Sequence, residues 1–323
     1  MKKINIGLLG LGNIGTGAYK TLEMNKESIK NTIGCPIEVT KILEKDIDRE
    51  RDITVSKEQF VSTPEEIFND ETISIVVELI GGIEPATSFM LSAMENGKSV
   101  VTANKAAVAA NYDKLIETAK KNNVEFRFEA SVGGGIPIIN ALSTVLRSNQ
   151  FEEILGIVNG TTNYMLTQMT DFNLEYADVL KVAQEKGFAE ADPTADVEGI
   201  DVANKLTILM ALAFGKHVKP EDIPTEGISK ITKEDITKAT ENNCRIKLIA
   251  SAKKNGNDIE YSVKPVALPI EHPLATVNNE FNAVFVKGNA VGEVMFYGKG
   301  AGPLPTGSAV MGDVIDIAKT ITK

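Results

Sequence analysis

Apolar runs alternate with helical patterns along the first 135 residues of the chain. The runs are almost continuously apolar, which is typical of parallel strands covered on both faces, and the helical patterns supply the crossovers of a doubly wound sheet. An α/β domain is therefore predicted over residues 1–135. Its strands are expected at 4–10, 37–43, 73–80, 99–103 and 124–128.

The order of elements changes after residue 135 and predicts an α+β domain over 136–302. The expected elements are a helix at about 137–147, a strand at 152–159, helices through about 215, and strand pairs at 244–269 and 281–297. The final segment, 303–323, has helical spacing at Val310, Val314, Ile317 and Ile321. This spacing predicts a last helix that returns to pack on the first domain.

The composition excludes several classes of protein. A formal net charge of -10 repels nucleic-acid backbones and anionic lipid, so we expect small-molecule partners and neither nucleic acid nor membrane. The only cysteines, Cys35 and Cys244, lie far apart and form no CxxC motif. This spacing argues against a disulfide framework or a structural zinc site and favours the cytoplasm.

A glycine-rich motif follows the first predicted strand. Gly10, Gly12 and Gly15 form GxGxxG, with Asn13 and Ile14 between them, and a helical pattern begins directly afterwards. In such a loop, backbone N–H groups and a helix N-terminus hold the pyrophosphate of a dinucleotide. A turn made only for tight helix packing would explain one glycine better than three. The motif therefore predicts a Rossmann domain that binds NADP or NAD.

The end of the second predicted strand leaves the choice between these cofactors open. Glu44 suits the ribose 2′-hydroxyl of NAD, whereas Lys45 suits the 2′-phosphate of NADP. Either residue is equally well explained as a solvated strand end.

A helix predicted over 201–214 is apolar or small on every side except for one pair of charges. Asp201 and Lys205 are spaced i,i+4, and their shared face continues into apolar residues, so the pair should point inward. An exposed pair would contribute only about 0.3–0.5 kcal/mol, and a buried pair is a poor source of stability, so a functional explanation is favoured. Burial lowers the pKa of a lysine and an adjacent carboxylate limits that fall, which makes Lys205 a candidate acid or base.

The segment before this helix, 188–198, is rich in carboxylates. Acceptor-only side chains beside a catalytic lysine suit a substrate ammonium, so an amino-acid substrate is predicted. A solvated acidic loop is the usual explanation of such a run but does not account for the lysine, and the spacing matches no EF-hand cation site. A second lysine, Lys105, follows the fourth predicted strand, where open α/β sheets bind ligands; a surface lysine in a loop is the alternative.

Together these motifs resemble homoserine dehydrogenase over nearly the whole chain. The stretches that carry the resemblance, in family order, are GLLGLGNIGTG, ELIGG, TANKA, EASVGGGIPI, NGTTNYML, FAEADPTADVEGIDVANK and YGKGAGPLPTGSAV. The resemblance implies a Rossmann domain, 1–135 joined by the C-terminal helix 303–323, and a substrate-binding and dimerisation domain, 136–302. It also implies reversible NAD(P)-dependent oxidation of L-homoserine to L-aspartate 4-semialdehyde, in threonine and methionine biosynthesis, by a cytoplasmic homodimer.

The resemblance further implies roles for individual residues. Lys205 would be the proton donor or acceptor, Asp201 its partner, and Lys105 would approach the reacting oxygen. Substrate-binding positions would be Glu190, Asp196, Gly160 and Thr161. Cofactor-binding positions outside the glycine motif would be Glu44, Lys45, Thr102, Lys105, Gly300 and Gly302. A structural sodium ion would be held largely by backbone carbonyls at Glu129, Val132, Gly134 and Ile136.

The sequence departs from the family pattern in two places. The family often has an arginine where Lys45 stands, with an apolar residue before it, so the preference between NAD and NADP is not implied. Many bacterial relatives continue into a C-terminal regulatory ACT domain, and this sequence ends at Lys323. We therefore expect a short form without threonine feedback through such a domain.

Other functions remain as alternatives to this one. Another NAD(P)-dependent amino-acid dehydrogenase would share the dinucleotide site. An aspartate-semialdehyde dehydrogenase needs a cysteine nucleophile, and Cys35 and Cys244 both lie outside the motifs. A non-enzymatic NAD-sensing regulator would have no use for the pair of Asp201 and Lys205.

Overall fold

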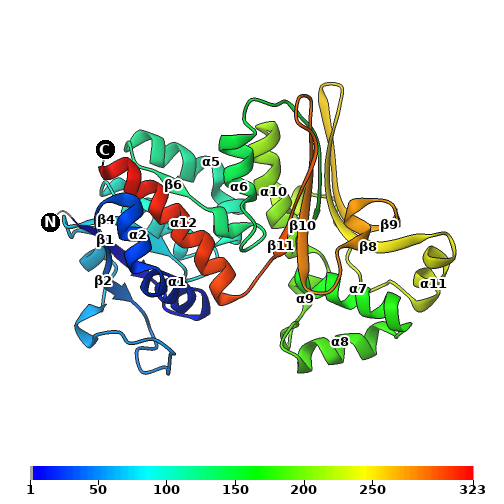
Figure 1. Ribbon diagram of the computed structural model, residues 1–323, viewed down its shortest axis with the longest axis horizontal. Helices are drawn as coiled ribbons and strands as arrows, with labels where there is room; N and C mark the ends of the chain where they lie inside the picture. Colours follow the sequence, from blue (N-terminus) through cyan, green and yellow to red (C-terminus); the bar gives the residue numbers. More distant parts are fainter. Residues whose placement is uncertain (1–2, 323) are drawn as a thin grey trace. The chain divides into compact units, whose positions relative to one another are not determined.

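The computed structural model describes residues 3–322, which form two compact units (Figure 1). One unit comprises the chain up to Gly135 together with the segment from Ala301 onward, and the other comprises Ile136–Gly300. The first unit contains a parallel sheet and the second an antiparallel one. The predicted fold class, a doubly wound α/β sheet plus an α+β unit, is confirmed.

The first unit is built on a six-stranded parallel sheet in the order β3-β2-β1-β4-β5-β6. The strand order reverses between β1 and β4, which is where open α/β sheets bind ligands. All five predicted strands form, whereas β3 escaped prediction because two residues carry no periodicity. The strands are β1 (Ile4–Leu9), β2 (Ile37–Leu43), β3 (Phe60–Val61), β4 (Ile73–Glu78), β5 (Ser99–Thr102) and β6 (Phe126–Arg127).

The last helix, α12 (Pro303–Thr322), packs on α1 (Asn13–Met24), although the two come from opposite ends of the chain (Figure 1). A side chain at Gly17 would collide with the backbone of Pro303, so the helices touch where α1 has no Cβ. Val310 and Val314 are fully buried in the same core as Ala18 and Leu22 of α1. The other helices of this unit are α2 (Lys26–Ile33), α3 (Glu65–Phe68), α4 (Ala86–Glu95) and α5 (Lys105–Lys121), with 3₁₀ turns at Lys57–Gln59 and Glu129–Ser131.

The second unit is built on a five-stranded antiparallel sheet in the order β11-β10-β7-β8-β9. Helices pack on one face, and the segment around Pro273–Thr276 covers part of the other. The strands are β7 (Phe151–Ile157), β8 (Cys244–Asn255), β9 (Asp258–Pro269), β10 (Phe281–Gly288) and β11 (Gly292–Lys299). The helices are α6 (Ile138–Asn140), α7 (Gly160–Phe172), α8 (Tyr176–Glu185), α9 (Thr194–Val197), α10 (Ile200–Phe214) and α11 (Lys233–Glu241), with 3₁₀ turns at Pro220–Asp222 and Pro273–Thr276.

The helix predicted at about 137–147 forms over Ile138–Val145, but it is not an α-helix throughout. The α-helical turn α6 gives way to a π-helical stretch, Ala141–Val145, in which the N–H of Leu146 donates to the carbonyl of Ala141 five residues earlier. The hydroxyl of Ser143 donates to the carbonyl of Ile139 (2.7 Å) and competes with the regular ladder, a local effect that apolar periodicity does not reveal. None of the helices within residues 3–322 has both the length and the apolar character needed to span a bilayer.

Candidate functional site

The glycine loop between β1 and α1 has the shape that a bound pyrophosphate requires. Side chains at Gly10 and Gly15 would collide with backbone atoms, of Leu79 and of Gly10 respectively, so both positions are needed for close packing. Gly12 differs, because a Cβ there would meet nothing within 4 Å. Gly12 is also the N-cap of α1 and brings no side chain to the first-turn N–H groups. The open space beside uncapped donors fits the phosphates of a dinucleotide.

A buried polar network ties together the carboxyl ends of β4 and β5. Glu78 is completely buried and accepts hydrogen bonds from the N–H of Ile80 (2.7 Å) and the hydroxyl of Thr102 (2.7 Å). Burial raises the pKa of the Glu78 carboxyl. Thr102 in turn accepts from the N–H of Asn104 (2.9 Å), which caps α5, so Lys105 is held at the first position of that helix. The loops that follow β4 and β5 are thus fixed by one carboxyl group that the sequence did not single out.

The charge pair on α10 lies out of water, as predicted. The side chains of Lys205 and Asp201 are 10% and 5% exposed, and the amine lies 2.7 Å from the carboxylate. Lys205 Nζ also donates to the carbonyl of Val158 (2.5 Å), just beyond the end of β7. Ten of the fifteen residues of α10 are buried, so the helix gives the pair a surrounding of low polarity. An amine held in this way is oriented for proton transfer.

Asn159 connects this pair to the acidic loop. Its amide nitrogen donates to Asp196 Oδ1 (2.7 Å) and to Asp201 Oδ2 (2.9 Å). Its amide oxygen accepts from the N–H of Thr162 (2.9 Å) and so caps α7, which fixes the orientation of the amide. The sequence analysis did not select Asn159. An asparagine directly before a helical pattern, within NGTTNY, was the signal that could have revealed it.

The remaining predicted substrate positions lie around this network to different degrees. The hydroxyl of Thr161 lies 2.6 Å from the carbonyl of Phe188 and 3.2 Å from Asp196 Oδ2. Gly160 packs so closely that a Cβ would lie 2.9 Å from the carbonyl of Glu280. Glu190 is exposed on the loop between α8 and α9. The structure therefore joins Lys205, Asp201, Asp196 and Thr161 by hydrogen bonds and leaves the carboxylate of Glu190 at the solvent.

A second buried lysine, also missed from the sequence, supports the start of α7. Lys247 is 1% exposed and donates to the carbonyl of Val277 (2.6 Å) and to the side-chain oxygens of Asn163 and Asn278 (both 3.2 Å). Burial, and next the charge of Arg245, lower the pKa of Lys247 to about 8. Asn163 lies one turn after Gly160, so this lysine holds the segment that closes over the first turn of α7.

The residues predicted to bind a cation are buried or tightly turned. Glu129 is 6% exposed, and its N–H donates to Asp313 Oδ2 (2.8 Å). Burial, together with the neighbouring charge of Glu129, raises the pKa of Asp313 to about 7. Val132 and Ile136 are buried, and Gly134 has a φ of +56°. Within residues 3–322, no group of three His, Cys, Asp or Glu side chains forms a metal cluster.

The two glycines predicted to lie near the cofactor have different surroundings. A side chain at Gly300 would collide with the side chain of Asn282, whose amide is 1% exposed and has no hydrogen-bond partner among the described residues. Gly302 has a φ of +114°, which side chains rarely tolerate. The backbone conformation therefore requires glycine at Gly302, whereas at Gly300 the side chain of Asn282 occupies the space that a Cβ would need.

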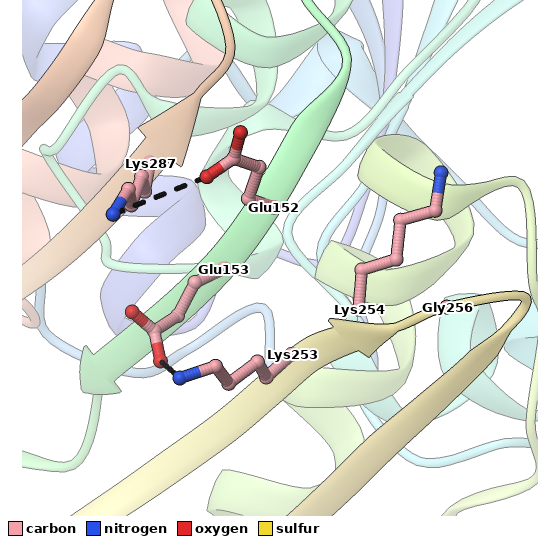
Figure 2. A pocket seen from close by; sticks show the side chains of 6 residues that line it. All are labelled: Glu152, Glu153, Lys253, Lys254, Gly256 and Lys287. Atoms are coloured by element: carbon pink, nitrogen blue, oxygen red, sulfur yellow. Dashed lines mark ion pairs between the residues drawn. The ribbon is translucent and has the colours of Figure 1, made fainter.

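A surface pocket of about 280 Å³ lies at the other end of β7 (Figure 2). Its acidic and basic side chains pair with one another, Glu153 with Lys253 (3.4 Å) and Glu152 with Lys287 (3.9 Å). Asn159 lies six positions after Glu153, beyond the end of β7, which corresponds to a distance of roughly 20 Å along an extended chain. The pocket is thus remote from the network around Lys205, and these two ion pairs involve four of its five charged side chains.

Comparison with known proteins agrees with this geometry. Residues 10–129 match the family model of the homoserine dehydrogenase NAD binding domain, and residues 137–315 match that of homoserine dehydrogenase. Homoserine dehydrogenase of Bacillus subtilis is 44% identical over 321 residues, 99% of this chain and 74% of its own length. The crystal structure of a homoserine dehydrogenase from Thiobacillus denitrificans is 45% identical, with a TM-score of 0.96, over 100% of this chain and 74% of that one.

A more distant structure carries a cofactor. A hyperthermophilic archaeal homoserine dehydrogenase, solved in complex with NADPH, is 28% identical, with a TM-score of 0.84, over 100% of this chain and 99% of that one. These likenesses cover both units and agree with the glycine loop and the α+β unit described above. The chain therefore belongs to the homoserine dehydrogenase family, NAD(P)-dependent oxidoreductases that act on a CH–OH group.

Proposed function

We propose that the chain interconverts L-homoserine and L-aspartate 4-semialdehyde, and that the network around Lys205 binds the amino acid and moves its hydroxyl proton. The observation that carries this assignment is the buried contact of Lys205 with Asp201, linked through Asn159 to Asp196. An ion pair kept out of water contributes little to stability, so its chemistry is the better explanation of its presence.

The residues of the network divide the work between binding and proton transfer. Asp196, assisted by Glu190, accepts hydrogen bonds from the substrate ammonium, and Thr161 and Gly160 line the same part of the unit. In oxidation, neutral Lys205 takes the proton from the substrate hydroxyl; in reduction, the protonated amine returns it. Asp201 and the carbonyl of Val158 orient the amine throughout.

The first unit supplies the dinucleotide site. The N–H groups at the start of α1 hold the pyrophosphate beside Gly12, and Thr102 and Lys105 stand at the carboxyl end of β5, with Lys105 assisting at the reacting oxygen. When bound, the nicotinamide accepts or donates the hydride. We propose that residues 1–135 with 303–323 are the dinucleotide-binding domain and residues 136–302 the substrate-binding domain.

The direct test follows reduced-nicotinamide absorbance with homoserine and either NAD or NADP. Turnover should depend on homoserine and rise toward alkaline pH, because oxidation releases a proton. Absence of turnover with both cofactors, in a protein that still binds them, would contradict the proposed function and favour a regulator that senses the dinucleotide. Turnover with phosphate and the semialdehyde in place of homoserine would indicate an aspartate-semialdehyde dehydrogenase.

We further propose that the protein is a homodimer formed through the open face of the second sheet. Met295 and Tyr297 on β11 are 40% and 54% exposed, and their cross-strand partners on β10 are Phe285 and Ala283. Tyr297 stacks on Phe281 with ring centroids 5.2 Å apart. Phe285 and Ala283 are themselves buried, so the exposed part of this face is formed by Met295 and Tyr297. Large apolar side chains exposed next to one another on a sheet face are typical of a surface that another chain covers.

A structural sodium ion bound by carbonyls near Glu129 is proposed on the basis of the buried carboxyl groups of Glu129 and Asp313, which a cation would stabilise. The midpoint of thermal unfolding should rise in sodium chloride relative to choline chloride at equal ionic strength. Identical midpoints would contradict this site.

We also propose that the protein works in the cytoplasm, where its dinucleotide cofactors are made. Both Cys35 and Cys244 are free thiols, which fits a reducing compartment. Cell fractionation with a periplasmic or secreted marker as a control tests this location.

A further inference from the structure

Glu44, the residue directly after β2, places its carboxylate against the glycine loop. Glu44 Oε2 accepts from the N–H of Leu11 (2.5 Å), between the first two glycines of the motif, and Oε1 accepts from the N–H of Asp46 (3.0 Å). The side chain of Glu44 is only 14% exposed, whereas Lys45 is exposed. Of the two residues that the sequence leaves as rivals, Glu44 is therefore the one that contacts the dinucleotide loop.

The carboxyl group of Glu44 is ionised at neutral pH. Burial raises its pKa, but the N–H donors of Asp46 and Leu11 and the charge of Arg51 act in the opposite direction and prevail, so the pKa lies below its usual value. Arg51 Nη2 lies 3.7 Å from Glu44 Oε2. A fixed negative charge thus stands beside the glycine loop at the end of the second strand.

The two nearby arginines are engaged elsewhere. The guanidinium of Arg51 is 7% exposed and donates to the main-chain carbonyls of Leu11 (2.8 Å), Arg49 (2.8 Å) and Asp46 (2.7 Å). Arg49 Nη2 donates to the side chain of Asn13 (2.7 Å) at the start of α1, where the pyrophosphate is expected. Neither arginine is therefore placed as an uncommitted partner for a further phosphate at the end of β2.

This arrangement discriminates between the two dinucleotides. The residue at the end of the second strand faces the adenosine ribose, where a carboxylate accepts from the 2′-hydroxyl of NAD and repels the 2′-phosphate of NADP. The same fold binds either dinucleotide, so the local side chains determine the preference. The 28% identical archaeal neighbour was solved with NADPH. Resting on the proposed function, we propose that Glu44 makes the dinucleotide site of this chain selective for NAD over NADP.

The test compares two probes that differ only in the 2′-phosphate, ADP-ribose and 2′-phospho-ADP-ribose, with binding measured by calorimetry. The wild-type protein should bind ADP-ribose roughly 100-fold more tightly, because juxtaposed like charges are strongly unfavourable. Glu44→Gln keeps the shape and one acceptor but removes the charge, and should narrow this ratio by about tenfold, chiefly through tighter binding of the phosphorylated probe. The ratio of kcat/KM for NAD and NADP with homoserine should move in parallel.

Glu50→Gln is the matched control, since Glu50 is an exposed glutamate of the same loop and should leave the ratio unchanged within about twofold. The proposal is overturned if the wild-type protein binds 2′-phospho-ADP-ribose as tightly as ADP-ribose, or if Glu44→Gln leaves the ratio unchanged while its thermal unfolding matches the wild type. Should Glu44→Gln fail to fold, the wild-type ratio still decides. Absence of homoserine turnover by the wild-type protein with both cofactors would contradict the proposed function. Binding of the two probes would still test the role of Glu44.

Discussion

Replacing Lys205 by methionine should abolish turnover without preventing dinucleotide binding. The change leaves the carboxylate of Asp201, 5% exposed, without the ammonium that lies 2.7 Å away. Breaking a buried pair typically costs about 3–5 kcal/mol, and loss of an acid–base group lowers kcat by about 10²–10⁴-fold. A fall in activity could therefore arise from lost stability as well as from lost chemistry.

A second variant separates these two causes. Asp201→Asn combined with Lys205→Met removes both charges from the interior, so the free energy of unfolding should recover by most of the amount that the single variant loses. The value of kcat should stay at the level of the single variant, because no amine is restored. Denaturant unfolding, kcat with homoserine and the fluorescence of bound reduced nicotinamide measure stability, chemistry and cofactor binding separately.

Lys181→Met is the control, since Lys181 is an exposed lysine of α8. This variant should change the free energy of unfolding by no more than about 0.5 kcal/mol and leave kcat unchanged. The reasoning is refuted if Lys205→Met retains kcat within about threefold of the wild type, which is far less than an acid–base group contributes. It is equally refuted if the double variant recovers turnover together with stability, because the pair would then be a structural feature.

Three further predictions concern the second unit. Asp196→Ala should raise the KM for homoserine by about tenfold or more with a smaller effect on kcat, since it removes an acceptor for the ammonium, and an unchanged KM would exclude this role. The pKa of Lys247 is about 8 in the folded protein against an ordinary 10.5, so below pH 8 the lysine is charged in both the folded and the unfolded chain. Between pH 8 and 10.5 the unfolded chain binds more protons than the folded one, so the free energy of unfolding rises with pH. The unfolding free energy of the wild type relative to Lys247→Met should therefore increase by up to about 3 kcal/mol between pH 8 and 10. The same comparison with Lys254→Met, at an exposed position of the same strand, should show no such change. A difference between the wild type and Lys247→Met that does not depend on pH would contradict the buried charge. Tyr297→Lys should place a charge in the proposed dimer face and yield monomers by light scattering, and an intact dimer would show that another surface is used.

Local patterns were sufficient to predict much of the candidate site. The GxGxxG motif and the i,i+4 pair of Asp201 and Lys205 each lie within a few residues, so their geometry follows from one loop or one helix. Their burial could also be inferred, because a helix that is apolar on all sides leaves no exposed face for the charges. The functional roles of these residues stay predictions until the variants are made.

Other residues of the site could not be found from local patterns. Asn159 lies 37 positions before Asp196 and 42 before Asp201, and only the packing of α7, α9 and α10 brings the three side chains together. In the sequence, Lys247 is a single charged residue within a strand and gives no sign of burial. Its burial depends on the segment around Val277, 30 residues away. The two-residue strand β3 and the π-helical turn after α6 depend on hydrogen bonds that carry no periodic signal.

The sequence by itself determined the class of the fold, the family and the type of reaction, because apolar periodicity and short motifs encode strands, helices and the groups that bind phosphate or move a proton. The tertiary structure alone decided which of Glu44 and Lys45 contacts the glycine loop and which amide joins the acidic loop to the pair of Lys205 and Asp201. The physical reason is the range of the interactions. Periodicity is set by neighbours along the chain. The partner of a buried polar atom is set by the distant segment that packs against it, and a buried polar group without a hydrogen-bond partner costs too much free energy to be common.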